Sequence, residues 1–192
     1  MKTQVSIVLV CCILSVNTAI AQERFSGEFR PFLNFPLEKL EEKNLGVGFG
    51  FEMEVAYKMM PHLKAYAGFG WSEFKTEANF QETSTLLNET FFPLGFELTF
   101  PVSKAPLTYY GQVGAVLENV SLEDLNTGVQ RDSGYGVGWQ IGIGVEYVFT
   151  EYWSLKPEIG YRSFSKTLQD HASSTKLDLN YISLSVGIQR AF

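Results

Sequence analysis

The chain has 192 residues, 45% of them hydrophobic, and a formal net charge of −6. This length and composition suit one folded domain. The acidic balance and the lack of a basic patch exclude a nucleic-acid partner, because binding to phosphate backbones needs clustered Lys and Arg.

The first 21 residues have the pattern of an export signal. Lys2 supplies a positive start, residues 5–16 are mostly apolar, and residues 19–21 (AIA) fit the small-x-small cleavage rule. The apolar run is too short for a membrane-spanning helix, which needs about 20 residues. We therefore expect a signal peptide at 1–21 and a mature barrel domain at 22–192. Both cysteines leave with the signal, so the mature chain has no disulfide.

The mature chain divides into segments in which apolar residues alternate with glycine and polar residues. A period of two is that of a β-strand with one apolar face. No helical pattern is long enough for a crossover, which favours an up-and-down antiparallel meander of about eight strands. The expected strands are Phe25–Phe35, Leu45–Lys58, Leu63–Phe74, Thr90–Phe100, Leu107–Asn119, Gly134–Phe149, Tyr152–Phe164 and Tyr181–Phe192.

The connectors between these segments alternate between long and short. Such asymmetry is expected of a transmembrane β-barrel, which has tight periplasmic turns at one end and extended extracellular loops at the other. The final strand also needs a partner for its open edge, so we expect it to close the barrel against the first strand. The long connectors are Pro36–Asn44, Lys75–Glu89, Val120–Ser133 and Ser165–Lys176.

The polar face of the strands indicates which side of the barrel is inside. It is rich in glycine, which weakens an exposed strand but leaves room in a narrow lumen. It also carries both signs of charge, which must pair inside a small barrel. Because the interior of an eight-stranded barrel is just wide enough for side chains to fill it, we expect a packed ion-pair network rather than a conduction path or a proton relay. Its expected members are Glu28, Arg30, Glu52, Glu54, Lys64, Glu97, Glu146, Lys156, Glu158 and Arg162.

The apolar face places aromatic residues toward the strand ends, as the interfacial girdles of membrane barrels do. This pattern favours an apolar face turned to lipid. The alternative is a soluble periplasmic barrel whose inward apolar face binds an apolar ligand. The expected girdle residues are Trp71, Tyr135 and Tyr161 near the long connectors, and Tyr57, Phe100, Tyr109, Tyr147, Trp153 and Phe192 near the short turns.

The chain ends in GIQRAF with Phe192 as its last residue. This ending resembles the β-signal of small OmpA/OmpX-type outer-membrane β-barrels, and the resemblance extends over residues 22–192. It implies residence in the cell outer membrane, contact with outer-membrane lipid, and transient partnership with the outer-membrane assembly machinery and periplasmic chaperones. It identifies an architecture rather than an activity.

The two histidines are candidates for catalysis or metal binding. His171 and Ser173 form a His-x-Ser pair similar to that of lipid A deacylases, and residues two apart on a strand share a face. The pair lies in a polar connector, however, so a lipid A-modifying hydrolase is kept as an alternative. His62 lies in a tight turn, and without mature cysteines the sequence predicts neither a transition-metal site nor a cofactor.

The sequence therefore predicts a monomeric, non-enzymatic membrane barrel with a structural or surface-interaction role. Any specific binding is expected in the long connectors, because exposed loops on a rigid scaffold are where binding usually occurs.

Overall fold

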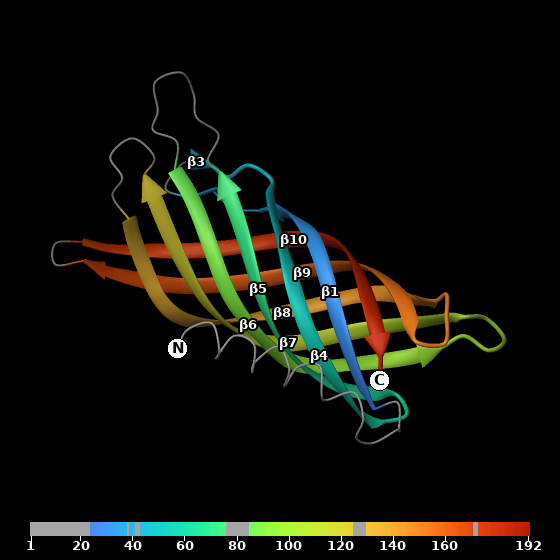
Figure 1. Ribbon diagram of the computed structural model, residues 1–192. Coiled ribbons are helices and arrows are strands. Elements are labelled where there is room, and N and C mark those ends of the chain that lie inside the picture. Colours follow the sequence, from blue (N-terminus) through green and yellow to red (C-terminus); the bar gives the residue numbers. More distant parts are fainter. Residues whose placement is uncertain (1–23, 38, 41–42, 76–84, 125–129, 171–172) are drawn as a thin grey trace, which may run out of the picture.

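The computed structural model describes residues 24–37, 39–40, 43–75, 85–124, 130–170 and 173–192, and they form a closed antiparallel barrel (Figure 1). The predicted signal peptide lies outside the described residues. Among the residues described, no helix is long and apolar enough to cross a membrane. The barrel strands are β1 (Phe25–Pro36), β4 (Gly48–Met60), β5 (Leu63–Lys75), β6 (Thr85–Pro101), β7 (Leu107–Asp124), β8 (Gln130–Val148), β9 (Trp153–Asp170) and β10 (Ser173–Ala191).

The first and last strands close the barrel, as the open edge of the final strand predicted. Strand β1 pairs with β10 from Ser26↔Ala191 to Pro36↔Tyr181, and it pairs with β4 from Phe25↔Tyr57 to Asn34↔Gly48. The backbone N–H of Phe192 donates to the carbonyl of Phe25 at 2.9 Å, which adds a bond at the end of this seam. All other neighbours in the barrel are sequential strands, so the topology is the expected meander.

Most strands are longer than the sequence predicted, and two of the four expected long connectors, Val120–Ser133 and Ser165–Lys176, are largely strand. β6 already begins at Thr85, β7 continues to Asp124, and β10 begins at Ser173. The connector Pro36–Asn44 holds two short strands, β2 (Lys39–Leu40) and β3 (Lys43–Asn44), paired with each other. The predicted boundaries were wrong because ladder hydrogen bonds continue beyond the zone in which one face must be apolar. We call this end of the barrel the long-loop end and the opposite one the short-turn end.

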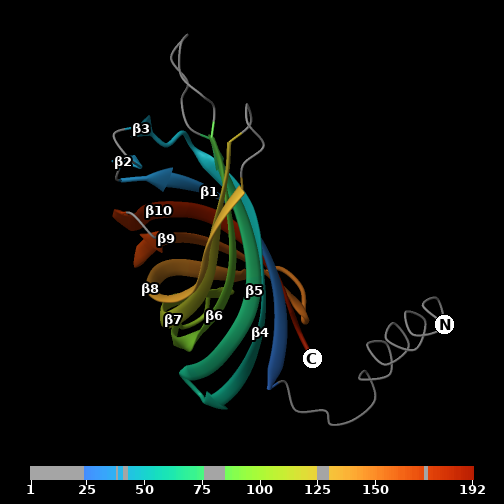
Figure 2. The ribbon, with the colours of Figure 1, turned by 90° about the vertical axis from the view of Figure 1, so that its left-hand side faces the viewer.

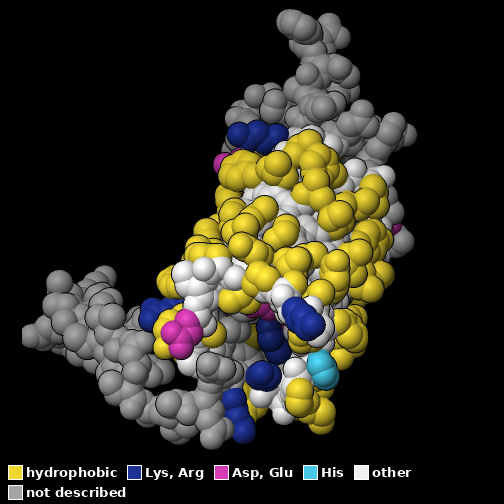
Figure 3. Space-filling view, turned by 90° about the vertical axis from the view of Figure 1, so that its right-hand side faces the viewer, with side chains coloured by type: hydrophobic (Ala, Val, Ile, Leu, Met, Phe, Trp, Pro, Cys, Tyr) yellow, Lys and Arg dark blue, Asp and Glu magenta, His cyan; other side chains and the backbone are white. Residues whose placement is uncertain are grey.

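The apolar residues of the strands face outward. Figure 3 shows one face of the outer wall, which is largely hydrophobic, with charged side chains at both of its ends. Leu94 and Val137 on this outer face are 65% and 70% exposed. The alternative of a soluble barrel with its apolar face turned inward is therefore wrong.

The lumen contains an apolar layer that the sequence analysis missed. It lies toward the long-loop end and consists of the buried residues Phe74, Leu87, Val120, Phe164, Leu179 and Tyr181. Phe91, together with Phe32 and Val116, forms a second buried apolar cluster. Several inward aromatic rings lie over a glycine of the neighbouring strand, where an added Cβ would come within 3 Å of the ring. These ring–glycine pairs are Phe74 with Gly48, Phe91 with Gly70 and Phe164 with Gly136.

Candidate functional site: the barrel lumen and its long-loop rim

Arg30 of β1 is the centre of the charged lumen. Its guanidinium lies 2.7 Å from Glu28, 3.2 Å from Glu54 and 3.3 Å from Glu158. A fourth carboxylate, that of Glu52, lies at 3.9 Å. These partners come from the same strand, from β4 and from β9, so one buried arginine joins strands on both sides of β1. A buried guanidinium needs such partners, because an unpaired charge in the interior is costly.

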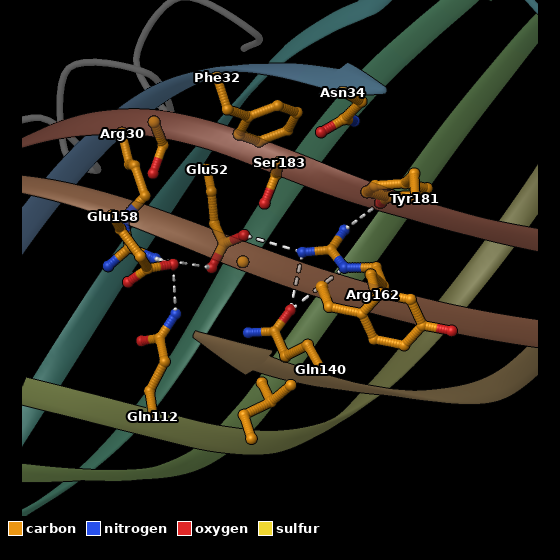
Figure 4. Close-up of a pocket in the computed structure, with 14 residues that line it drawn as sticks. Arg30, Phe32, Asn34, Glu52, Gln112, Gln140, Glu158, Arg162, Tyr181 and Ser183 are labelled. Atoms are coloured by element: carbon orange, nitrogen blue, oxygen red, sulfur yellow. Dashed lines mark hydrogen bonds and ion pairs between the residues drawn. The ribbon is translucent and has the colours of Figure 1, made fainter. Parts of the chain in front are cut away.

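Arg162 of β9 forms a second centre on the long-loop side of Arg30 (Figure 4). Its Nη2 donates to Glu52 at 3.0 Å and to Gln140 at 2.7 Å, and its Nη1 donates to Tyr181 Oη at 2.9 Å. The guanidinium carbon stands 3.7 Å from the centre of the Phe91 ring, a cation–π contact. Arg162 therefore joins the charged part of the lumen to its apolar layer.

Two lysines organise the charges on the short-turn side. Lys156 Nζ donates to Glu28 at 2.8 Å and to Glu97 at 2.7 Å, and it lies 4.3 Å from the centre of the Tyr110 ring. Lys64 Nζ lies 2.8 Å from Glu97 and 3.6 Å from Glu146. These contacts reach from the middle of the barrel to its short-turn mouth.

The ten charged residues that the sequence placed on the lumen face are thus joined in one connected network of ion pairs. Glu28 links Arg30 to Lys156, Glu97 links Lys156 to Lys64, and Glu52 links Arg30 to Arg162. Lys64 and Glu146 are partly exposed at the mouth, whereas the others are buried.

The sequence analysis missed two further lumen carboxylates, Glu89 and Glu118, both fully buried. Glu89 lies 3.4 Å from Arg162 and accepts hydrogen bonds from Ser72 Oγ at 2.6 Å and Tyr181 Oη at 3.0 Å. In the described part of the chain, neither carboxylate oxygen of Glu118 has a hydrogen-bond partner. A correct start for β6 would have placed Glu89 on the lumen face, because the two-residue period continues through it.

The charged network leaves little empty space. The cavity beside Arg30, Glu52 and Arg162 has a volume of about 20 Å³ (Figure 4). A cavity of roughly 10–15 Å³ by this measure accommodates one water molecule. Gln112 and Glu158 line the same cavity, and Gln112 donates to Glu158 at 2.9 Å.

The residues expected to form aromatic girdles lie on the outer wall. Those near the short turns are exposed, from Tyr57 at 37% to Phe100 at 59%. Trp71 and Tyr161 near the long-loop end are partly covered by neighbouring rings, Phe49 at 5.9 Å and Trp139 at 5.3 Å between centroids.

The predicted hydrolase pair is not placed by the structure. His171 and the side chain of Ser173 lie outside the described residues. Within the described ranges, no group of three or more His, Cys, Asp or Glu side chains is arranged to hold a metal ion.

The barrel wall divides at the long-loop rim. β8 pairs with β9 only as far as Trp139↔Ser163, whereas β7–β8 pairing continues to Glu123↔Gln130 and β9–β10 pairing to Ser173↔Asp170. Figures 1 and 2 show the two hairpins extending apart beyond the barrel. Lys166 of β9 reaches across and donates to the carbonyl oxygens of Ser133 and Tyr135 on β8.

Comparisons with known proteins agree with this architecture. Neisserial surface protein A superposes with a TM-score of 0.65 at 17% identity, over 88% of this chain and 97% of that chain. OprG from Pseudomonas aeruginosa gives a TM-score of 0.60 at 10% identity, over 88% and 96%. Ail, the attachment invasion locus protein of Yersinia pestis, gives 0.53 at 12% identity, over 89% and 100%.

A search of curated proteins found no match. The family model for the outer membrane protein beta-barrel domain, in contrast, matches residues 7–192, nearly the whole chain. The closed barrel with its apolar outer wall is the architecture that this match requires. The chain therefore belongs to the outer membrane protein beta-barrel family and resides in the cell outer membrane.

Proposed function

We propose that this protein is a surface-interaction barrel whose strand extensions at the long-loop end bind a partner. The observation that carries the proposal is the division of the wall between β8 and β9 beyond Trp139↔Ser163. Long extracellular segments belong to the outer face of such barrels. The two hairpins therefore present strand edges to the outside of the cell.

An uncovered strand edge has unpaired N–H and C=O groups and can accept a further strand. Among the described residues, no ladder pair joins β8 residues 130–138 to β9 residues 164–170. The contact of Lys166 with the carbonyl of Tyr135, at 2.8 Å, spans this gap and fixes its width without closing the ladder. The partner in this proposal is a protein with an extended segment, held mainly by backbone hydrogen bonds.

The comparisons support this role only through the fold. Ail is named an attachment invasion locus protein, and Neisserial surface protein A is named a surface protein. Each is less than 20% identical in sequence to this chain, so their binding partners are not transferred to it.

The test is adherence of bacteria that display the barrel to surfaces coated with a library of extended, unfolded peptides. The variant replaces residues 167–176 with Asn-Gly, because Lys166↔Leu177 are in register and a two-residue turn can close the hairpin there. We expect adherence by the wild type and at least a tenfold loss in the variant. Glu151→Gln, in a short turn at the opposite end, is the control. Equal adherence of both variants, or none by the wild type, would contradict the proposal.

We propose further that the lumen is structural and closed, that the protein is a monomer, and that it catalyses no reaction. The support is the connected ion-pair network and the small cavity beside Arg30. Breaking one side of a buried ion pair leaves an uncompensated charge, so these pairs hold the strands in one arrangement.

We also propose that the assembly machinery and periplasmic chaperones are transient partners, with the last strand as the segment recognised. The support is the exposed ring of Phe192 at the end of the closing strand, where it is 52% exposed.

A further inference from the structure

Gly111 of β7 creates a notch in the otherwise bulky outer wall. The register places Leu98 of β6 on one side of it and Ile143 of β8 on the other. The nearest heavy atom to a Cβ added at Gly111 would be the carbonyl oxygen of Gly142, 3.8 Å away. Gly114 on the same strand faces the lumen, where its Cβ would lie 2.5 Å from Tyr66 Oη. Lumen packing therefore explains Gly114 but not Gly111, and glycine in a strand often marks close approach of a ligand.

The notch is the floor of a groove of about 480 Å³. This volume falls within the range of roughly 300–1,000 Å³ that is typical of small-molecule sites. Its walls are apolar, so a peptide backbone or a polar ligand would lose hydrogen bonds on entering it. The lining side chains come from β6 (Phe96, Leu98 and Phe100), β7 (Val113) and β8 (Ile141 and Ile143).

The groove begins at the short-turn end of the wall. Phe100 forms a ladder pair with the girdle residue Tyr109 just before the turn that joins β6 to β7. Short turns of outer-membrane barrels lie in the periplasm. The groove therefore lies at the depth of the periplasmic leaflet of the membrane. Lipid of the outer leaflet lies at the other aromatic girdle, near the long-loop end.

The turn next to the groove contains an unusual lysine. Lys104 has a φ of 65°, and among the described residues it is the only non-glycine residue in the left-handed region. It lies in a turn closed by donation from Ala105 N–H to the carbonyl of Val102 at 3.2 Å. Turns with such a conformation favour glycine or asparagine, and backbone strain of this kind is concentrated at functional sites. The Lys104 ammonium is exposed and is suited to bind a phosphate.

From the groove and the turn together, we propose that this face binds one anionic phospholipid of the periplasmic leaflet. One acyl chain lies in the groove over Gly111, and the Lys104 ammonium contacts the phosphate. A second barrel is a poorer occupant, because its convex wall cannot fill a narrow concavity. The site is independent of the surface-interaction role, since it lies at the opposite end of the molecule.

The test is native mass spectrometry of the folded protein released from micelles that contain a small fraction of phosphatidylglycerol. We expect one retained phosphatidylglycerol per wild-type barrel. Gly111→Val fills the notch from the lipid side without a clash, and we expect at least a tenfold loss of retention. Ala115→Val adds bulk to the same outward face outside the groove and should retain lipid as the wild type does. Lys104→Gln should lower retention about fivefold, the effect of removing one cation near a membrane surface.

Lys104→Gly separates the left-handed backbone conformation of the turn from its positive charge. It should raise the midpoint of urea unfolding, because glycine relieves the left-handed conformation. It should also lower phosphatidylglycerol retention as much as Lys104→Gln does. Equal retention by the wild type and Gly111→Val would overturn the proposal. So would wild-type retention by both Lys104 variants, or retention of a second barrel in place of phosphatidylglycerol.

Discussion

At the residue scale, two neighbouring carboxylates in the lumen have opposite surroundings. Glu89 and Glu118 are both 0% exposed. Glu89 lies beside Arg162 and accepts hydrogen bonds from Ser72 and Tyr181. Neither oxygen of Glu118 has a hydrogen-bond partner within the described residues. A charge on Glu89 is thus compensated by hydrogen-bond donors, whereas a charge on Glu118 would face the Glu89 carboxylate beside it without a donor of its own.

This contrast predicts opposite effects of the same substitution. Glu89→Gln should lower the free energy of unfolding by about 1.5–3 kcal/mol, the contribution of hydrogen bonds to a charged group. Glu118→Gln should leave the free energy of unfolding unchanged or raise it, because it removes the repulsion between two neighbouring carboxylates, which outweighs the attraction of Glu118 to Arg162. Urea unfolding in lipid vesicles, followed by tryptophan fluorescence, measures both. If both variants lose the same free energy of unfolding, the hydrogen-bond partners of each carboxylate do not determine the effect of its substitution.

The glycines of the lumen predict a second contrast. A Cβ on Gly70 would lie 2.1 Å from the Phe91 ring, which is held in place by Arg162. Gly70→Ala should therefore lower stability by about 1–3 kcal/mol through overpacking. Gly111→Ala points into open space and should be nearly neutral. The temperature at which the folded band shifts on a gel compares the two variants, and an unchanged temperature for Gly70→Ala would contradict the packing argument.

At the element scale, the closing strand depends on its final residue. The N–H of Phe192 donates to the carbonyl of Phe25, and the Phe192 ring lies 5.2 Å from the Arg190 guanidinium. Deleting Phe192 removes this bond and the exposed aromatic ring at the end of β10. We expect slower insertion into the outer membrane, with export unchanged. The folded fraction in membranes after a pulse of synthesis measures it, with Phe192→Tyr as the conservative control. Equal folded fractions for the deletion and the wild type would exclude this role.

The sequence predicts the membrane-spanning parts of these strands well, and the physical reason is the lipid. Where one face must be apolar and the other faces a narrow lumen, the two-residue period is imposed on every strand. Beyond the membrane the outer face meets water and need not be apolar, so the alternation weakens although the ladder continues. Polar residues such as Asn88 and Ser121 are therefore paired in strands that the sequence assigned to connectors.

The side chains of the lumen were also only partly predictable from the sequence. The charged network was predictable, because charges on the inward face of a strand must find partners inside. The buried rings of Phe74, Phe91 and Phe164 were missed because apolar residues were assigned to the outer wall. The sequence could have placed them in the lumen, because the two-residue alternation of each strand puts these three residues on its lumen face. Their contact with glycines of neighbouring strands depends on the register, which periodicity alone does not give.

At the scale of the whole molecule, two different layers of side chains lie in series along the lumen. The charged layer around Arg30 and Arg162 leaves a cavity of about 20 Å³, enough for about one water molecule. The apolar layer lies above it, toward the long-loop end, and buries the rings of Phe74 and Phe164. An ion crossing the barrel would have to displace the first layer and lose its hydration in the second.

Closure in series predicts a specific pattern of conductance in planar bilayers. The wild type should show no stable conductance. Phe74→Ala with Phe164→Ala opens only the apolar layer and should remain closed, because the charged layer still fills the lumen. Arg162→Ser opens only the charged layer and should also remain closed. The triple variant opens both layers and should conduct, provided that its gel mobility confirms a folded barrel. A steady conductance from the wild type, or from either partial variant alone, would mean that the two layers do not close the lumen independently.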